Sequence, residues 1–167
     1  LGDASFVTDV RRALDHSGLA PGRLLLEITE SMLVDNPDNA AEVLGTLRDV
    51  GVRVALDDFG VGHTSLDQLR MLPVDVVKFD RAFVTSSLAA NSSVLRGLVE
   101  FARNLGLDTV GEGVETPGQL GQLGSMGCMY AQGFLFARPL SPGDAKLLLD
   151  ERTTWPAAPA GALGVVR

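Results

Sequence analysis

The chain alternates between short apolar runs and longer segments in which apolar residues recur every three or four positions. Short runs bounded by glycine or polar residues predict buried strands, whereas the longer period predicts helices with one apolar face. Glycine or proline stands at most ends of the periodic segments, as is typical of helix boundaries. Strands are predicted at residues 24–28, 52–56, 74–79, 108–114 and 129–134, and helices beginning near residues 6, 37, 64, 92, 117 and 142.

This alternation of strand and helix predicts an α/β fold with about five predominantly parallel strands and flanking helices. Parallel strands are covered by helices on both faces, so they read as continuous apolar runs. A length of 167 residues corresponds to one domain. Residues 1–152 are predicted to form it, and residues 153–167, rich in Ala, Pro and Gly, to be a disordered terminus or a linker.

Charged side chains stand at the ends of the predicted strands. Asp57 and Asp58 directly follow an apolar run, and Lys78 lies inside another. Function in parallel βα folds sits where the C-terminal ends of the strands meet, so these charges predict one shared polar mouth. Two further strand ends carry paired glutamates three residues apart, namely Glu27 with Glu30 and Glu112 with Glu115.

The adjacent carboxylates of Asp57 and Asp58 favour a divalent cation. Burying two like charges side by side is costly unless a positive charge lies beside them, and hard cations prefer oxygen ligands. Two simpler interpretations stay open. In the first, the two aspartates lie at a solvated strand end and cap the next helix. In the second, Lys78 belongs to an edge strand and does not contact a phosphate or water.

Composition narrows the class of partner. The net charge of −7 leaves no basic stripe for a DNA or RNA duplex. No apolar run approaches the ~18 residues of a membrane span, so direct membrane insertion is not expected. Cys128 is the single cysteine, so an intrachain disulfide is excluded and a cytoplasmic location is favoured. We interpret Cys128 as a buried core residue.

Five ordered segments resemble the successive motifs of EAL domains, the cyclic di-GMP-specific phosphodiesterases with a modified (β/α)8 barrel of the TIM-barrel type. The resemblance extends from about residue 6 to residue 149. The segments are LEITES at 26–31, ALDDFGVGHTSL at 55–66, LPVDVVKFD at 72–80, VGEGVET at 110–116 and QGFLFARPL at 132–140.

The resemblance implies hydrolysis of cyclic di-GMP to linear pGpG by two Mg²⁺ or Mn²⁺ ions. It implies that Glu27, Asp57 and Asp58 are metal ligands, with Asp58 at the second metal. Lys78 would contact the attacking water or a phosphate oxygen, and Glu112 the metal site. Glu30 would hold the loop after Asp58, and the family implies homodimerisation through this loop. Further supporting roles are implied for Asp80, Glu115 and Gln132.

The chain also departs from the family pattern. It lacks the Glu-Ala-Leu motif and the asparagine ligand of the next strand, and five strands are too few to close an eight-stranded barrel. We therefore expect a partial barrel that is inactive alone but catalytic within an intact parent protein. Other domains of that parent can tether it to a membrane.

His63, in the loop after Asp58, is interpreted as a packed or solvated substitution. The alternatives are a non-catalytic module that binds cyclic di-GMP or a protein partner, and a metal enzyme with another class of substrate.

Overall fold

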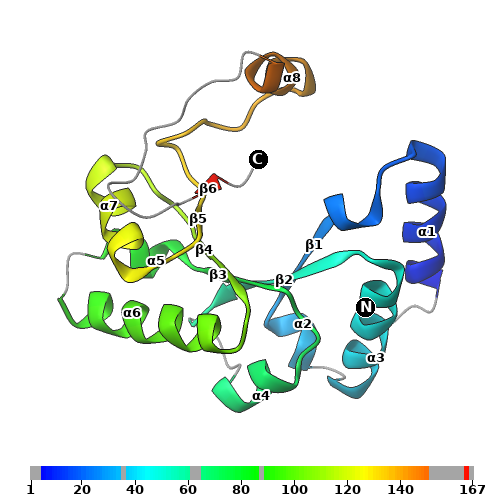
Figure 1. Cartoon of the computed structure of the whole chain (residues 1–167), viewed down its shortest axis with the longest axis horizontal. Coiled ribbons are helices and arrows are strands. Elements are labelled where there is room, and N and C mark those ends of the chain that lie inside the picture. The colour runs from blue at the N-terminus through cyan, green and yellow to red at the C-terminus, as the bar shows by residue number, and fades with distance from the viewer. Residues whose placement is uncertain (1–4, 35–36, 61–64, 87–88, 151–163, 166–167) are drawn as a thin grey trace. The chain divides into compact units, whose positions relative to one another are not determined.

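The computed structural model describes residues 5–34, 37–60, 65–86, 89–150 and 164–165. Helices and strands alternate along it, as predicted (Figure 1). In chain order the elements are α1 (Ser5–Ser17), η1 (Pro21–Arg23), β1 (Leu25–Thr29), α2 (Ser31–Val34), α3 (Pro37–Val50), β2 (Arg53–Phe59), α4 (Leu66–Met71), β3 (Val76–Phe79), α5 (Arg81–Thr85), α6 (Ala89–Asn104), β4 (Asp108–Gly111), α7 (Pro117–Met126), β5 (Tyr130–Ala131), α8 (Pro142–Asp150) and β6 (Gly164–Val165).

The strands are hydrogen-bonded in chain order from β1 to β6. β1 and β2 run parallel, with Glu27 opposite Ala55 and Thr29 opposite Asp57. β5 is parallel to both β4 and β6. Parallel strands joined by helices are the α/β arrangement that the sequence pattern predicts.

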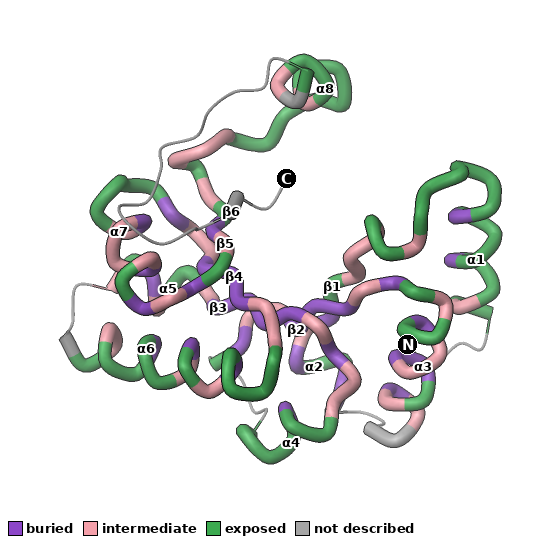
Figure 2. The backbone as a smooth tube through the Cα atoms, viewed as in Figure 1, coloured by how far each residue is buried: buried purple, intermediate pink, exposed green. Residues whose placement is uncertain are grey.

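The chain divides into two compact units. The first consists of Leu1–Lys78 and Asn104–Asp108. Within it α3 packs on β2 and α1 packs on α3. Most residues of β2 are buried or half-buried (Figure 2), as expected for a strand covered by helices.

The second unit consists of Phe79–Arg103 and Thr109–Arg167. Its helix α7 has a capping box, in which Thr116 accepts a hydrogen bond from the Gln119 backbone and the Gln119 side chain accepts one from Thr116 N. Gly127, with φ 80°, ends the helix in the left-handed conformation. The predicted helix start near residue 117 is therefore confirmed, with proline and glycine at its two ends.

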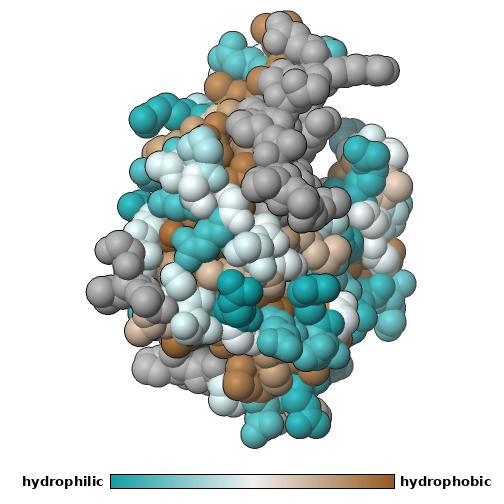
Figure 3. Space-filling view, turned by 60° about the vertical axis from the view of Figure 1, so that its left-hand side comes forward, coloured by the Kyte–Doolittle hydropathy of each residue, from teal (hydrophilic) through white to brown (hydrophobic). Residues whose placement is uncertain are grey.

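Exposed surface is mixed in character. On the face shown in Figure 3, hydrophilic residues are interspersed with hydrophobic ones, which is ordinary for helices whose polar side faces water. Among the residues that the structure describes, no helix combines the length and apolar content needed to cross a bilayer.

Several boundaries differ from the prediction. β2 continues through both aspartates to Phe59, whereas β4 already ends at Gly111 and β5 has only two residues. The short helices α2 and α5 were not predicted, because four or five residues carry no helical period. Within 153–167 only Gly164–Val165 are described, so the interpretation of that segment as a disordered terminus or linker stays a prediction.

Cys128 is buried at 4% exposure, as its interpretation as a core residue requires. Its thiol donates to the carbonyl oxygens of Tyr130 at 3.3 Å and Thr109 at 3.5 Å. Burial raises the pKa of the Cys128 thiol, because the apolar surroundings disfavour the thiolate. A neutral thiol of this kind packs as a small apolar side chain.

Gly133 generates the first prediction. Its φ is 157°, and a Cβ atom there would lie 2.3 Å from both the N and the O atom of Val114. Gly133→Ala should therefore lower the free energy of unfolding by about 2 kcal/mol, since backbone cannot move away cheaply. Urea unfolding followed by circular dichroism measures the change.

The matched control is Gly97→Ala. Gly97 lies in α6, and a Cβ atom there would have no neighbour within 4 Å. Alanine should raise helix stability at that position by about 0.5–1 kcal/mol. Equal effects of the two substitutions would contradict the predicted collision at Gly133.

Candidate active site

Lys78 is the centre of the charged residues in the first unit. Its ammonium lies 2.8 Å from Glu27 Oε2 and 3.0 Å from Asp57 Oδ1. The lysine side chain is only 3% exposed, against 21% for Asp57 and 42% for Glu27. A buried ammonium requires such counter-charges, so Lys78 is held inside the strand layer by the two carboxylates.

The three residues come from three strands whose apolar runs fix their positions. Glu27 lies on β1, Asp57 on β2 and Lys78 on β3. All four residues of β3 are buried, including the lysine. The interpretation of Lys78 as an exposed edge-strand residue is therefore wrong, and its charge faces the carboxylates of the two other strands.

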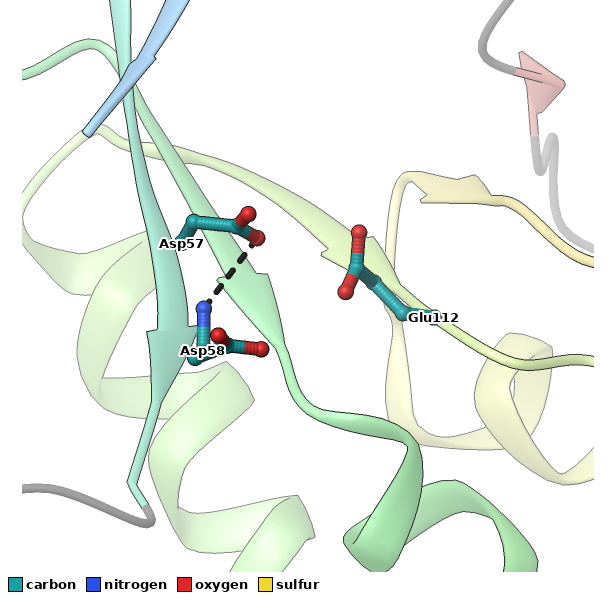
Figure 4. A group of neighbouring side chains, drawn as sticks. All are labelled: Asp57, Asp58 and Glu112. Carbon is teal, nitrogen blue, oxygen red and sulfur yellow. Dashed lines mark hydrogen bonds between the residues drawn. The ribbon is translucent and has the colours of Figure 1, made fainter. Parts of the chain in front are cut away.

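Asp57 and Asp58 present their carboxylates to one place. Neighbouring side chains of a strand normally point to opposite faces, yet carboxylate oxygens of these two residues lie within 4.8 Å of each other. Asp58 has φ 56°, a left-handed conformation that interrupts the alternation. Its N–H donates to Asp57 Oδ1 at 3.1 Å (Figure 4), which holds the two residues in this conformation.

Glu30 supports the chain directly after β2. Its side chain is buried, with the residue 6% exposed, and Oε1 accepts a hydrogen bond from Gly60 N at 3.2 Å. The contact ties the end of β1 to the residue that follows Phe59. The next residues, 61–64, include His63 and the loop implied in dimerisation, and they lie outside the described part of the chain.

The second unit contains the other predicted site residues. Glu112 follows β4 (Figure 4), and its N–H donates to Phe79 O at 3.1 Å. Gln132 is exposed and its carbonyl accepts from Val114 N at 3.0 Å, which places the segments after β4 and β5 side by side. Glu115 is exposed.

Asp80 has a local structural role in this unit. Its carboxylate accepts a hydrogen bond from Ala82 N at 2.7 Å and caps α5. The supporting role of Asp80 at the site stays a prediction, whereas the contact that the structure shows is this helix cap. An aspartate just before a helix start is the sequence signal for such a cap. This cap was not predicted, because α5 is too short to show a helical period.

The chemistry of this arrangement suits hard cations. Glu27, Asp57 and Asp58 offer carboxylate oxygens, the donor type that Mg²⁺ and Mn²⁺ prefer. Lys78 partly neutralises the charge of Glu27 and Asp57 through its two ion pairs. The first unit therefore combines metal-ligand chemistry with one fixed positive charge.

Known proteins share this sequence pattern. The EAL domain family matches residues 1–139. The cyclic di-GMP phosphodiesterase NbdA of Pseudomonas aeruginosa is 44% identical over 142 residues, which cover 84% of this chain and 18% of NbdA. The chain spans about a fifth of the length of the first curated relatives that it matches.

Solved structures agree with the sequence comparison. The EAL domain of Mycobacterium smegmatis DcpA is 38% identical with a TM-score of 0.86, over 92% of this chain and 70% of that one. The manganese and cyclic di-GMP complex of Klebsiella pneumoniae BlrP1 at pH 6 is 33% identical with a TM-score of 0.76, over 82% and 35%. These likenesses confirm the predicted fold class, a partial barrel of the modified (β/α)8 type.

The buried ion pairs of Lys78 generate the second prediction. Lys78→Met should lower the free energy of unfolding by about 2 kcal/mol in the presence of a chelator, because Glu27 and Asp57 lose their shared cation. The value is below that of a fully buried pair since both carboxylates reach solvent. Chemical denaturation at neutral pH measures it.

Lys146→Met is the matched control. Lys146 pairs with Asp150 at 2.7 Å, but both side chains are more than half exposed. Loss of such a surface pair changes stability by no more than about 0.5 kcal/mol. If both methionine variants unfold at the same denaturant concentration, the buried ion pairs of Lys78 contribute nothing specific to the fold.

Proposed function

The chain belongs to the EAL domain family, and on this premise we propose that it is part of a cyclic di-GMP phosphodiesterase that forms linear pGpG. One observation carries the proposal, namely that Glu27, Asp57 and Lys78 from three strands meet in direct contact. A chain that needed only a stable barrel wall would gain more from apolar residues at these positions. The names of NbdA and of the BlrP1 complex support the same substrate.

We propose two Mg²⁺ or Mn²⁺ ions as the cofactors, with Glu27, Asp57 and Asp58 among their ligands. The closely spaced oxygens of Asp57 and Asp58 fit this donor chemistry. Bound cations would activate water and offset negative charge on the phosphoryl oxygens. The manganese complex of BlrP1 supports this choice.

The remaining residues position these groups. Lys78 holds a positive charge beside Asp57, where it would contact the attacking water or a phosphate oxygen. The family motifs imply that Glu112 would contact the metal ions and that Glu115 and Gln132 would have supporting roles. Glu30 would support the chain after Asp58 through its bond to Gly60 N.

The proposal extends to the setting of the domain. We propose that it works in the cytoplasm and forms a homodimer through the loop after Asp58. The net charge of −7 is unsuited to a nucleic-acid duplex. A small anionic dinucleotide is still compatible with this charge if metal ions bridge it to the carboxylates.

The third prediction tests catalysis through Asp57. In the intact protein that carries this chain, Asp57→Asn should lower turnover of cyclic di-GMP by at least about a hundredfold, because a neutral amide is a poor ligand for a hard dication. Chromatography of pGpG formed with Mg²⁺ or Mn²⁺ measures the rate. Asp15→Asn, an exposed position on α1, is the control and should retain parental turnover.

The isolated 167 residues should have little or no turnover, because ligands of the Glu-Ala-Leu strand are missing from them. Turnover by this chain alone that Asp57→Asn abolishes would contradict that expectation. Binding of cyclic di-GMP by the intact protein without any pGpG would instead favour a non-catalytic binding module. Parental turnover in the Asp57→Asn variant would remove Asp57 from the metal site.

A further inference from the structure

A polar cavity of about 380 Å³ lies within the first unit and is not lined by Glu27, Asp57 or Asp58. It is lined at the N-terminal ends of the strands, where Arg53 begins β2, Asp75 precedes β3 and Asp108 begins β4. Arg53 and Asp57 are four residues apart on β2, which corresponds to about 13 Å along the strand. The cavity is therefore separate from the proposed active site.

Arginines give this cavity its character. Arg48, Arg53 and Arg70 line it together with two aspartates, so its formal charge is positive in a chain whose net charge is −7. Leucines from α4 and from the segment before β4 complete the lining. The volume lies in the range of small-molecule sites. We call it the arginine cavity.

Two of the guanidinium groups are held in place by ion pairs. Arg53 Nη2 lies 2.5 Å from Asp108 Oδ2, and Arg48 Nε lies 3.4 Å from Asp75 Oδ1. Asp75 is itself fixed, because its Oδ2 accepts from Val54 N at 2.9 Å. Each arginine uses one nitrogen in these pairs, so further N–H groups of both remain for another acceptor.

In the part of the chain that the structure describes, Arg70 has no strong ion pair that would explain its position by a structural role. Its partner within the described residues is Asp67, 3.7 Å away on the same helix, with the aspartate side chain 94% exposed. Such a surface pair holds its arginine weakly. The partly exposed pairs of Arg48 and Arg53 hold the residues at the strand ends, whereas Arg70 adds a third positive charge to the same cavity.

We propose that the arginine cavity binds a small phosphate monoester. A phosphate group accepts several charge-assisted hydrogen bonds, and guanidinium groups match its geometry. The pairs of Arg48 and Arg53 orient two donors in advance, and Arg70 closes on the ligand from α4. The leucines contact the organic part of the ligand.

The test measures binding of adenosine 5′-monophosphate to the full chain by isothermal titration calorimetry with a chelator present. Arg70→Gln should weaken binding at least about tenfold, since a charge-assisted hydrogen bond is lost. Arg12→Gln is the matched control, because Arg12 also pairs with an aspartate three residues earlier on an exposed helix, at 3.2 Å. It should leave affinity unchanged. Adenosine without the phosphate should bind at least about tenfold more weakly than the monophosphate.

Three results would overturn the proposal. They are the absence of binding at millimolar nucleotide, equal affinity of the Arg70→Gln and Arg12→Gln variants, and equal affinity for adenosine and its monophosphate. None of these measurements involves Asp57 or cyclic di-GMP turnover. Failure here would therefore leave the proposed phosphodiesterase function untouched, and the converse also holds.

Discussion

The charged centre of this protein depends on one buried cation. Lys78 is almost fully enclosed, yet its ammonium contacts Glu27 and Asp57 from two other strands. Without these carboxylates a lysine inside β3 would be strongly unfavourable, and without the lysine two acidic strand ends would repel one another. The interaction thus allows Glu27 and Asp57 to lie at the ends of strands that are otherwise apolar.

The fold could be predicted wherever the pattern was long or continuous. The apolar runs before Glu27 and Asp57 located β1 and β2, and the helix predicted to begin near residue 117 is α7. The two-residue β5 and the short α5 could not be predicted in this way, because so few residues show neither a strand nor a helix period.

The candidate site could be predicted as a set of residues but not as a geometry. The position of Glu27, Asp57 and Lys78 in apolar runs indicated a shared polar mouth, and the family motifs supplied roles. The left-handed backbone of Asp58 was not visible in the sequence, since aspartate adopts extended conformations far more often. The arginine cavity was also missed, because its residues are scattered between Arg48 and Asp108 and share no motif.

The buried thiol of Cys128 has a practical consequence. Alkylating reagents attack the thiolate, and burial both hides this sulfur and keeps it protonated. A cysteine introduced at an exposed site such as Gly97 would therefore react selectively, without removal of the native residue. The protein thus accepts fluorophores or spin labels one position at a time on its natural background.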